Sequence, residues 1–153
     1  MTTVSEQSIH ETVWALFQAF KAPGALIFHV PNGEKRGPRV AAKLARMGVV
    51  AGVPDFVCMA RGRVCFLELK RAKGRVSTAQ AEFCGQAYAH GVTTHVARSV
   101  EEAVEFLQNI GVLRADIKFS SGDADAFARA QGGPEALVSG PSPKFTQEAA
   151  TAA

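Results

Sequence analysis

The chain has 153 residues, of which 47% are hydrophobic and 20% are charged, and its formal net charge is +3. This mixture is typical of a globular protein of about one domain, and it excludes a wholly disordered chain and a coiled coil. The apolar runs are far shorter than the roughly 18 residues of a membrane-spanning helix, and the polar N-terminus does not resemble a signal peptide. Three cysteines without a CxxC pair predict neither a disulfide framework nor a zinc site. We therefore expect a cytoplasmic protein with reduced cysteines and no membrane partner.

Positive charge is concentrated in the middle of the sequence. Residues 31–75 contain 11 Lys and Arg but only 3 Asp and Glu, whereas the rest of the chain is net acidic. A basic region in a nearly neutral protein is typical of a protein that binds a polyanion such as a nucleic acid. A solvated basic surface would show the same enrichment, so charge alone leaves both interpretations open.

The first third of the chain predicts a helix, a strand and a second helix. Residues 5–20 place apolar side chains at helical spacing, and residues 25–30 form a short apolar run that predicts a strand. Residues 38–47 predict a helix with proline at its start and glycine just past its end. This second helix has an apolar stripe and a basic stripe, so it could pack on a sheet and present cations to phosphates. The apolar stripe is Val40, Leu44 and Met47, and the basic stripe is Arg39, Lys43 and Arg46.

The remaining elements complete a mixed α/β pattern. Apolar segments over 55–60 and 63–70 flank a short Gly-containing turn, which predicts a β-hairpin. A helix over about 77–90, a strand over 92–97 and a helix over about 99–110 with a capping box at its start follow. The order α-β-α-β-β-α-β-α predicts a mixed central sheet flanked by helices. We expect this domain to span residues 1–113, and residues 114–153, rich in Ser, Gly, Ala, Asp and Pro, to form a flexible tail.

The predicted hairpin holds two carboxylates opposite each other. A symmetric turn pairs Cys58 with Cys65, and the same register pairs Asp55 with Glu68. Directly opposed residues share one face of the sheet with Cβ atoms about 5 Å apart. Lys70 follows Glu68 by two residues and therefore points to the same face. The two cysteines lie on the other face, where we expect a buried thiol pair.

Two carboxylates held this close repel each other unless one takes up a proton or a cation lies between them. Hard oxygen ligands favour Mg²⁺ or Mn²⁺. Lys70 would then lie beside the ion, where it could orient an attacking water or stabilise an anion forming at phosphorus. The same residues also allow a solvent-facing polar hairpin edge without a metal.

The order of these residues resembles the PD-(D/E)xK nuclease superfamily. Gly52-Val53-Pro54-Asp55 is followed after twelve residues by Glu68-Leu69-Lys70 and then by Ser77-Thr78-Ala79-Gln80. His29-Val30-Pro31-Asn32-Gly33 before the basic helix further resembles the VRR-NUC (virus-type replication-repair nuclease) branch. The resemblance covers about residues 6–107 and implies a restriction-endonuclease-like core.

The resemblance also implies roles for individual residues. Asp55 and Glu68 match the metal-binding carboxylates, and Leu69 matches the position whose backbone carbonyl joins the metal shell. Lys70 matches the catalytic lysine. Gln80 matches a glutamine of the site in the following helix, and it also forms a capping box with a serine three residues earlier, so it could have both roles.

Glu6 matches an acidic residue of the first helix that completes the family's metal site. A helical wheel places Glu6 near the edge of the apolar stripe, whereas Glu11 points to the opposite side. The family often has glutamine where His10 stands, which is a departure from its pattern. The other histidines, His29, His90 and His95, show no metal-ligand spacing, and we expect all four to be structural.

Polar and basic residues around the predicted site are candidate contacts to nucleic acid. Surface solubility is the alternative explanation for them. The candidates are Asn32, Lys35, Arg36, Arg39, Lys43, Arg46, Arg71, Lys73 and Arg75.

The resemblance implies a Mg²⁺- or Mn²⁺-dependent endonuclease that hydrolyses DNA phosphodiester bonds, with no organic cofactor. Stand-alone members of this branch resemble structure-specific enzymes that act as homodimers on branched DNA, such as four-way junctions or flaps. The small size suits a phage or mobile element and a role in DNA repair inside a bacterial or phage-infected cell. A catalytically silent nucleic-acid-binding module with the same fold is the main alternative, and an assembly protein with a basic surface is another.

Overall fold

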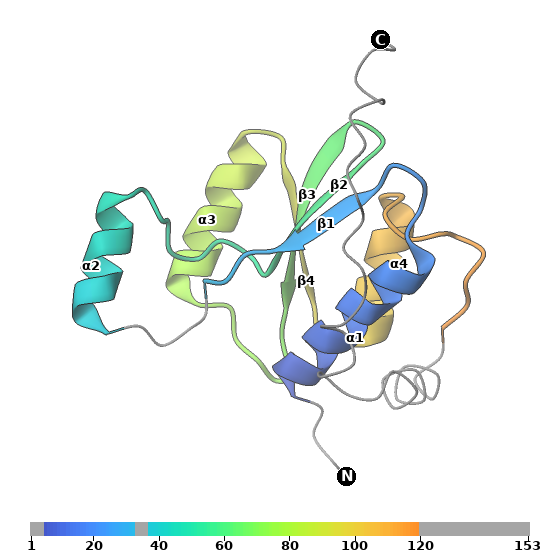
Figure 1. Ribbon diagram of the computed structural model, residues 1–153, viewed down its shortest axis with the longest axis horizontal. Coiled ribbons are helices and arrows are strands. Elements are labelled where there is room, and N and C mark those ends of the chain that lie inside the picture. Colours follow the sequence, from blue (N-terminus) through green and yellow to red (C-terminus); the bar gives the residue numbers. More distant parts are fainter. Residues whose placement is uncertain (1–4, 33–36, 120–153) are drawn as a thin grey trace.

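The computed structural model describes residues 5–32 and 37–119. Its four strands form one mixed sheet in the order β1-β2-β3-β4 (Figure 1). Neighbouring strands are antiparallel except for the parallel pair β3 and β4, which α3 connects. The strands are β1 (Leu26–His29), β2 (Phe56–Ala60), β3 (Arg63–Leu69) and β4 (Thr93–Ala97). The predicted order of elements and the mixed α/β class are confirmed.

Three of the four helices in the described residues begin at a serine whose hydroxyl caps the first turn. The side chains of Ser5, Ser77 and Ser99 each accept a backbone N–H of the first turn of their helix, which satisfies a donor that has no partner within the helix. The capping box predicted at Ser99 forms only in part, because the Glu102 carboxylate accepts the N–H of Arg98 instead. None of the helices in the described ranges is long and apolar enough to cross a membrane. The helices are α1 (Glu6–Phe20), α2 (Pro38–Arg46), α3 (Thr78–Ala89) and α4 (Val100–Asn109).

The core lies between one face of the sheet and the pair of helices α1 and α4. Alternate residues of each strand point to this face, as the two-residue period of a strand requires. Cys58 and Cys65 are directly opposed and both buried there, which confirms the predicted thiol pair. Burial raises the pKa of Cys58 to about 12, so its thiol is protonated at neutral pH. Fully buried members of the core include Val13, Leu16, Phe56, Leu67 and Leu107.

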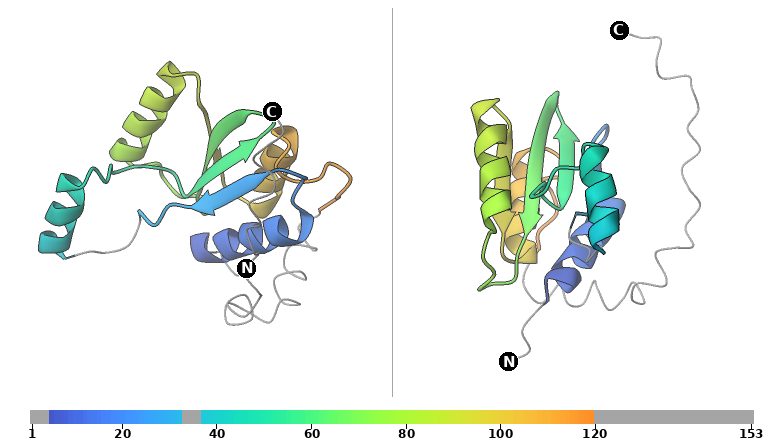
Figure 2. Two further views of the ribbon diagram at one scale, coloured as in Figure 1. Left: turned by 45° about the horizontal axis from the view of Figure 1, so that its top comes forward. Right: turned by 90° about the vertical axis from the view of Figure 1, so that its left-hand side faces the viewer.

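The opposite face of the sheet is covered by α3, and the right-hand view of Figure 2 shows α1 and α3 on opposite sides of the strands. This layer is thin. Of the α3 residues, all of which the structure describes, Ala87 alone is buried, and the Phe83 ring packs edge-on against Phe66 at a centroid distance of 5.2 Å. The residues of β3 that point toward α3 include Glu68, so α3 lies against the face that carries the carboxylates.

Helix α2 stands apart from the sheet, and the expectation that it packs there is wrong (Figure 1). None of its nine residues, all of which are described, is buried; Val40 within the helix and Met47 just after it are 51% and 69% exposed. The chain reverses after α2 at Gly48, whose φ of +88° suits glycine, and the N–H of Val49 returns to the carbonyl of Leu44. The chain leaves β1 and re-enters at β2, so α2 projects from the end of the sheet that carries Asp55.

The end of the described chain packs against the C-terminal end of α1. Lys21 and Leu113 form an isolated β-bridge, the N–H of Arg114 bonds the carbonyl of Phe20, and Phe119 contacts the Phe20 ring. Residues 114–119, the beginning of the predicted tail, therefore pack on the domain. The rest of that tail, residues 120–153, lies outside the described residues.

Candidate active site

The hairpin brings Asp55 and Glu68 together in the register that the sequence predicts. Phe56 pairs with Leu67 and Cys58 with Cys65, so Asp55 lies opposite Glu68 one residue beyond the ladder. The N–H of Asp55 donates to Oε2 of Glu68 at 3.3 Å. In return, Oδ2 of Asp55 accepts the N–H of Leu69 at 2.8 Å. The two carboxylates and the Leu69 backbone thus form one contiguous group of polar atoms.

Glu68 is only 2% exposed, which is rare for a carboxylate. Burial raises the pKa of Glu68 above its usual value; Lys70 opposes this effect, and the nearby Asp55 charge adds to it. Oε1 of Glu68 lies 2.6 Å from Nζ of Lys70 and also accepts a hydrogen bond from Nε2 of Gln80. A buried carboxylate with these partners is held in one orientation.

Lys70 lies beside both carboxylates with its side chain 13% exposed. Burial by itself lowers the pKa of Lys70, but the hydrogen bond and charge of Glu68, with the charges of Glu6 and Asp55, outweigh it and raise the pKa. The ammonium group therefore stays protonated at neutral pH. It can donate hydrogen bonds and attract an anion at this position.

Gln80 makes contacts that fit both of the roles considered from the sequence. Its Oε1 accepts the N–H of Ser77 at 2.9 Å, while the Ser77 hydroxyl accepts the N–H of Gln80, which is a complete capping box. Its Nε2 donates to Glu68. The first turn of α3 therefore fixes the Gln80 amide, and the amide in turn orients the buried carboxylate.

These two roles of Gln80 can be separated by mutation. Gln80→Ala and Ser77→Ala each remove part of the capping box, and each is expected to cost about 1 kcal/mol of stability. Only Gln80→Ala also removes the donor to Glu68, so it alone is expected to weaken Mn²⁺ affinity by about 10- to 100-fold. Urea unfolding and calorimetric Mn²⁺ titration of both variants make the comparison. Equal Mn²⁺ affinities would show that Gln80 serves the helix only.

Glu6 reaches the loop that follows β3. Its Oε1 accepts the N–H of Arg71 at 3.3 Å, and a Cβ on Gly74 would lie 3.0 Å from the same oxygen. The backbone oxygen of Arg71 would lie equally close at 3.0 Å, so a side chain at position 74 would require these neighbours to shift. The Glu11 carboxylate instead accepts a hydrogen bond from the exposed Gln7 at 2.8 Å. Glu6 is thus near enough for its charge to act on Lys70, although it does not touch Asp55 or Glu68 through a hydrogen bond.

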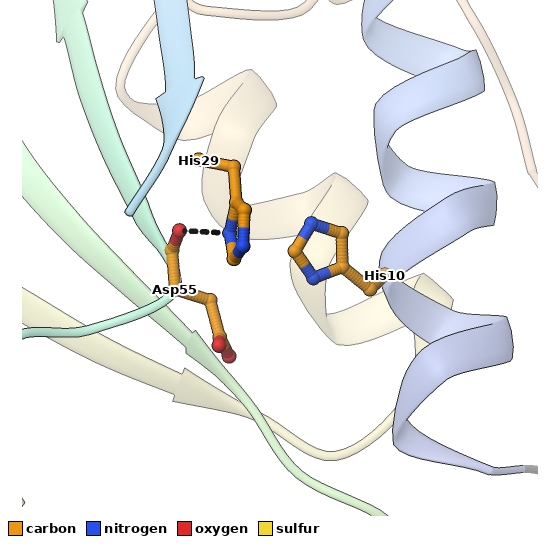
Figure 3. Close-up of side chains that lie close together, drawn as sticks. All are labelled: His10, His29 and Asp55. Atoms are coloured by element: carbon orange, nitrogen blue, oxygen red, sulfur yellow. Dashed lines mark hydrogen bonds between the residues drawn. The ribbon is translucent and has the colours of Figure 1, made fainter. Parts of the chain in front are cut away.

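Two histidines lie next to Asp55, and the sequence patterns did not predict this cluster. His10 on α1 and His29 at the end of β1 have ring centroids 4.4 Å apart, and each offers a nitrogen within 4.8 Å of the other and of an Asp55 carboxylate oxygen (Figure 3). Burial lowers the pKa of His10, and the neighbouring His29 lowers it further, more than Asp55 and Glu11 raise it. The four-residue spacing of Glu6 and His10, which puts both on one side of α1, is the signal that could have indicated this cluster.

The described candidate contacts to nucleic acid are two groups of exposed cations and the half-buried Asn32. Asn32 is half-buried and donates to the carbonyl of Val50 at 3.2 Å, so it ties together the two segments that carry α2. Lys35 and Arg36 lie outside the described residues. The exposed groups are Arg39, Lys43 and Arg46 on α2, and Arg71, Lys73 and Arg75 in the loop after β3.

Neither a family model nor a curated protein sequence matches this chain. Among solved structures, a "VRR_NUC domain protein" matches with a TM-score of 0.61 and 25% identity, over 72% of this chain and 90% of that one. A "VRR_NUC domain" structure matches with a TM-score of 0.47 and 16% identity, over 67% and 94% of the two chains. The first of these matches confirms the resemblance to VRR-NUC domains that the motifs indicate. The chain has the restriction-endonuclease-like fold of such a domain, and the likeness to the first of these structures indicates a nuclease-family domain.

Proposed function

We propose that this protein is a metal-dependent endonuclease that hydrolyses phosphodiester bonds of DNA. One observation carries the proposal: the buried Glu68 faces Asp55 and holds the Lys70 ammonium at 2.6 Å. A purely structural ion pair between Lys70 and Glu68 would not require a second carboxylate beside it, because two neighbouring negative charges destabilise each other. A divalent cation bound between the carboxylates would remove this repulsion.

The donor atoms here fit Mg²⁺ or Mn²⁺. The carboxylates of Asp55 and Glu68 would hold the ion together with the backbone carbonyl of Leu69, and Glu6 would complete the shell. All of these ligands are hard oxygen atoms, which both ions prefer. Such an ion supplies a water of lowered pKa and neutralises charge on the phosphate during attack.

The chain's own residues would position and stabilise the reacting groups. Because Lys70 carries a proton, it would donate to the attacking water or to a phosphoryl oxygen, where it favours the anionic transition state. Gln80 would keep Glu68 in the orientation that binds the ion. Asp55, held by the N–H of Leu69, would do the same from the other strand.

The substrate is proposed to be DNA, and in particular branched DNA. Exposed cations of α2 and of the loop after β3 can contact phosphates. Helix α2 projects from the end of the sheet that precedes β2 (Figure 1), and its exposed cations could extend this contact surface. The family resemblance supports four-way junctions or flaps as substrates, and a homodimer that could act on two strands of one junction.

Cleavage of labelled DNA in Mg²⁺, Mn²⁺ or EDTA tests this proposal. Four-way junction, flap, single-stranded and linear duplex substrates are compared. The wild-type chain is expected to cut in either metal and not in EDTA, with the junction or flap preferred. Asp55→Asn is expected to abolish cutting, whereas the matched control Asp116→Asn removes an exposed carboxylate that pairs with Arg114 and is expected to cut normally. Binding of the junction without cutting in either metal would contradict catalysis and favour a silent binding module.

A further inference from the structure

The cluster of His10, His29 and Asp55 offers imidazole nitrogens as ligands, whereas the site beside it offers only oxygen atoms. Its three side chains come from α1, from the end of β1 and from the residue before β2, and they lie close together in Figure 3. One ligand atom of each lies within 4.8 Å of the other two. Two imidazoles and a carboxylate from three separate segments therefore lie close enough together to hold one metal ion.

The hydrogen bond of His29 determines which of its nitrogens can bind a metal. Nδ1 of His29 lies 2.9 Å from the backbone carbonyl oxygen of Asp55. A carbonyl can only accept, so Nδ1 must carry the proton and Nε2 must carry the free lone pair. Histidines that bind metals usually donate their other ring N–H to a carbonyl or carboxylate in this way, which orients the ring and makes the ligating nitrogen more basic.

The position of His10 is also fixed by packing. Its ring lies 4.3 Å from the Phe56 ring and 4.4 Å from the His29 ring, and it is partly buried between them. Phe56 belongs to the core, and α1 is held to that core by its buried apolar stripe. Both imidazoles are therefore placed before any ion arrives, so little side-chain entropy would be lost on binding.

We infer that His10, His29 and Asp55 form a binding site for a divalent transition-metal ion of the Zn²⁺ type, separate from the oxygen site but sharing Asp55 with it. Imidazole nitrogen favours Zn²⁺ and its first-row neighbours over Mg²⁺. Three protein ligands leave a fourth position for water, as in zinc sites that are not closed by four side chains. The ion-binding step needs only these three side chains; a part for the ion in DNA hydrolysis would rest on the proposed function.

Metal binding to the full-length chain, without a polyhistidine tag and without DNA, tests the inference. Co²⁺ binding is followed by visible absorption, and Zn²⁺ binding by equilibrium dialysis with excess Mg²⁺ present. The wild type is expected to bind one Zn²⁺ that Mg²⁺ does not displace. His10→Gln and His29→Gln are each expected to weaken this binding more than about tenfold. The matched control His90→Gln removes an exposed imidazole at the end of α3 and is expected to bind as the wild type does.

Three results would overturn the inference. The first is unchanged Zn²⁺ affinity in both histidine variants, with thermal melts showing that they fold. The second is displacement of the bound ion by Mg²⁺, which would place it on the carboxylates alone. The third is a thiolate-to-Co²⁺ charge-transfer band, which would place the ion on cysteine. The metal-binding test contains no DNA, so its result does not depend on nuclease activity. A chain that binds Zn²⁺ through these histidines but cuts no DNA in the cleavage assay would contradict the proposed nuclease and still support this metal site.

Discussion

A Lys70→Met variant is expected to hydrolyse DNA about 100 to 10,000 times more slowly than the wild type while binding it nearly as well. The substitution removes the ammonium group that lies 2.6 Å from Glu68, where a reacting phosphate would be stabilised. Binding should change little, because Lys70 is only one of many cations near the site and is largely covered. Single-turnover cleavage in Mn²⁺ and a binding titration in Ca²⁺ separate the two effects.

The same variant should also be less stable in the absence of metal. Without Lys70, the buried Glu68 carboxylate loses its nearest cation, which costs on the order of 3 kcal/mol unless the group takes up a proton. Burial already raises the pKa of Glu68, and losing Lys70 raises it further. A group whose folded pKa is raised contributes stability below its unfolded pKa and loses it as the pH rises. The deficit should therefore be largest near neutral pH, shrink toward the usual glutamate pKa, and be reduced by added Mn²⁺.

The matched control is Lys73→Met in the loop that follows. Lys73 is exposed, so its loss is expected to lower the salt dependence of DNA binding slightly and to leave the cleavage rate unchanged. A Lys70→Met variant that cleaves as fast as Lys73→Met would remove Lys70 from the catalytic machinery.

Gly52→Ala is expected to destabilise the protein by about 3 kcal/mol or more. Gly52 has a φ of +81°, and a Cβ there would lie 2.2 Å from the backbone oxygen of Ala79 and 2.7 Å from the nitrogen of Gln80. Backbone atoms in the first turn of α3 cannot rotate away as a flexible side chain can. The segment leading to Asp55 would have to separate from α3, and Gln80 would then move away from Glu68. Urea unfolding in EDTA measures the stability, and Mn²⁺ titration measures the loss at the site.

Gly48→Ala provides the control for the effect of backbone conformation. Gly48 has a similar φ of +88°, but a Cβ there would meet nothing within 4 Å. Its substitution should therefore cost only the conformational strain, about 1 to 2 kcal/mol, and leave Mn²⁺ affinity unchanged. Equal losses of stability in the two variants would show that the contact between Gly52 and α3 contributes nothing beyond strain.

Local patterns were sufficient for the hairpin and its neighbours. The pairing of Cys58 with Cys65 follows from a short turn, because a two-residue loop leaves one register open to the strands. The same register places Asp55 opposite Glu68, and Ser77 marks the start of the helix that carries Gln80. Each of these relations joins residues within 13 positions of one another, so turn geometry and helix capping could determine them.

Helix α2 shows where such patterns fail. Its apolar stripe indicates burial, yet Val40 and Met47 are exposed, because the segments on either side carry the helix beyond the sheet. A hydrophobic stripe predicts that a face can be buried. It does not reveal which surface is within reach, since that depends on the path of the flanking segments.

The sequence by itself therefore determined the order of the elements, the register of the hairpin and the facing carboxylates, because these depend on short-range geometry. Tertiary structure alone decided the burial of Glu68, the approach of Glu6 to the loop at Gly74, and the meeting of His10 and His29 at Asp55. The contacts of Glu6 and His10 join α1 to segments that lie far along the chain. Their distances depend on how α1 packs across the sheet, and no periodicity within either segment encodes that packing.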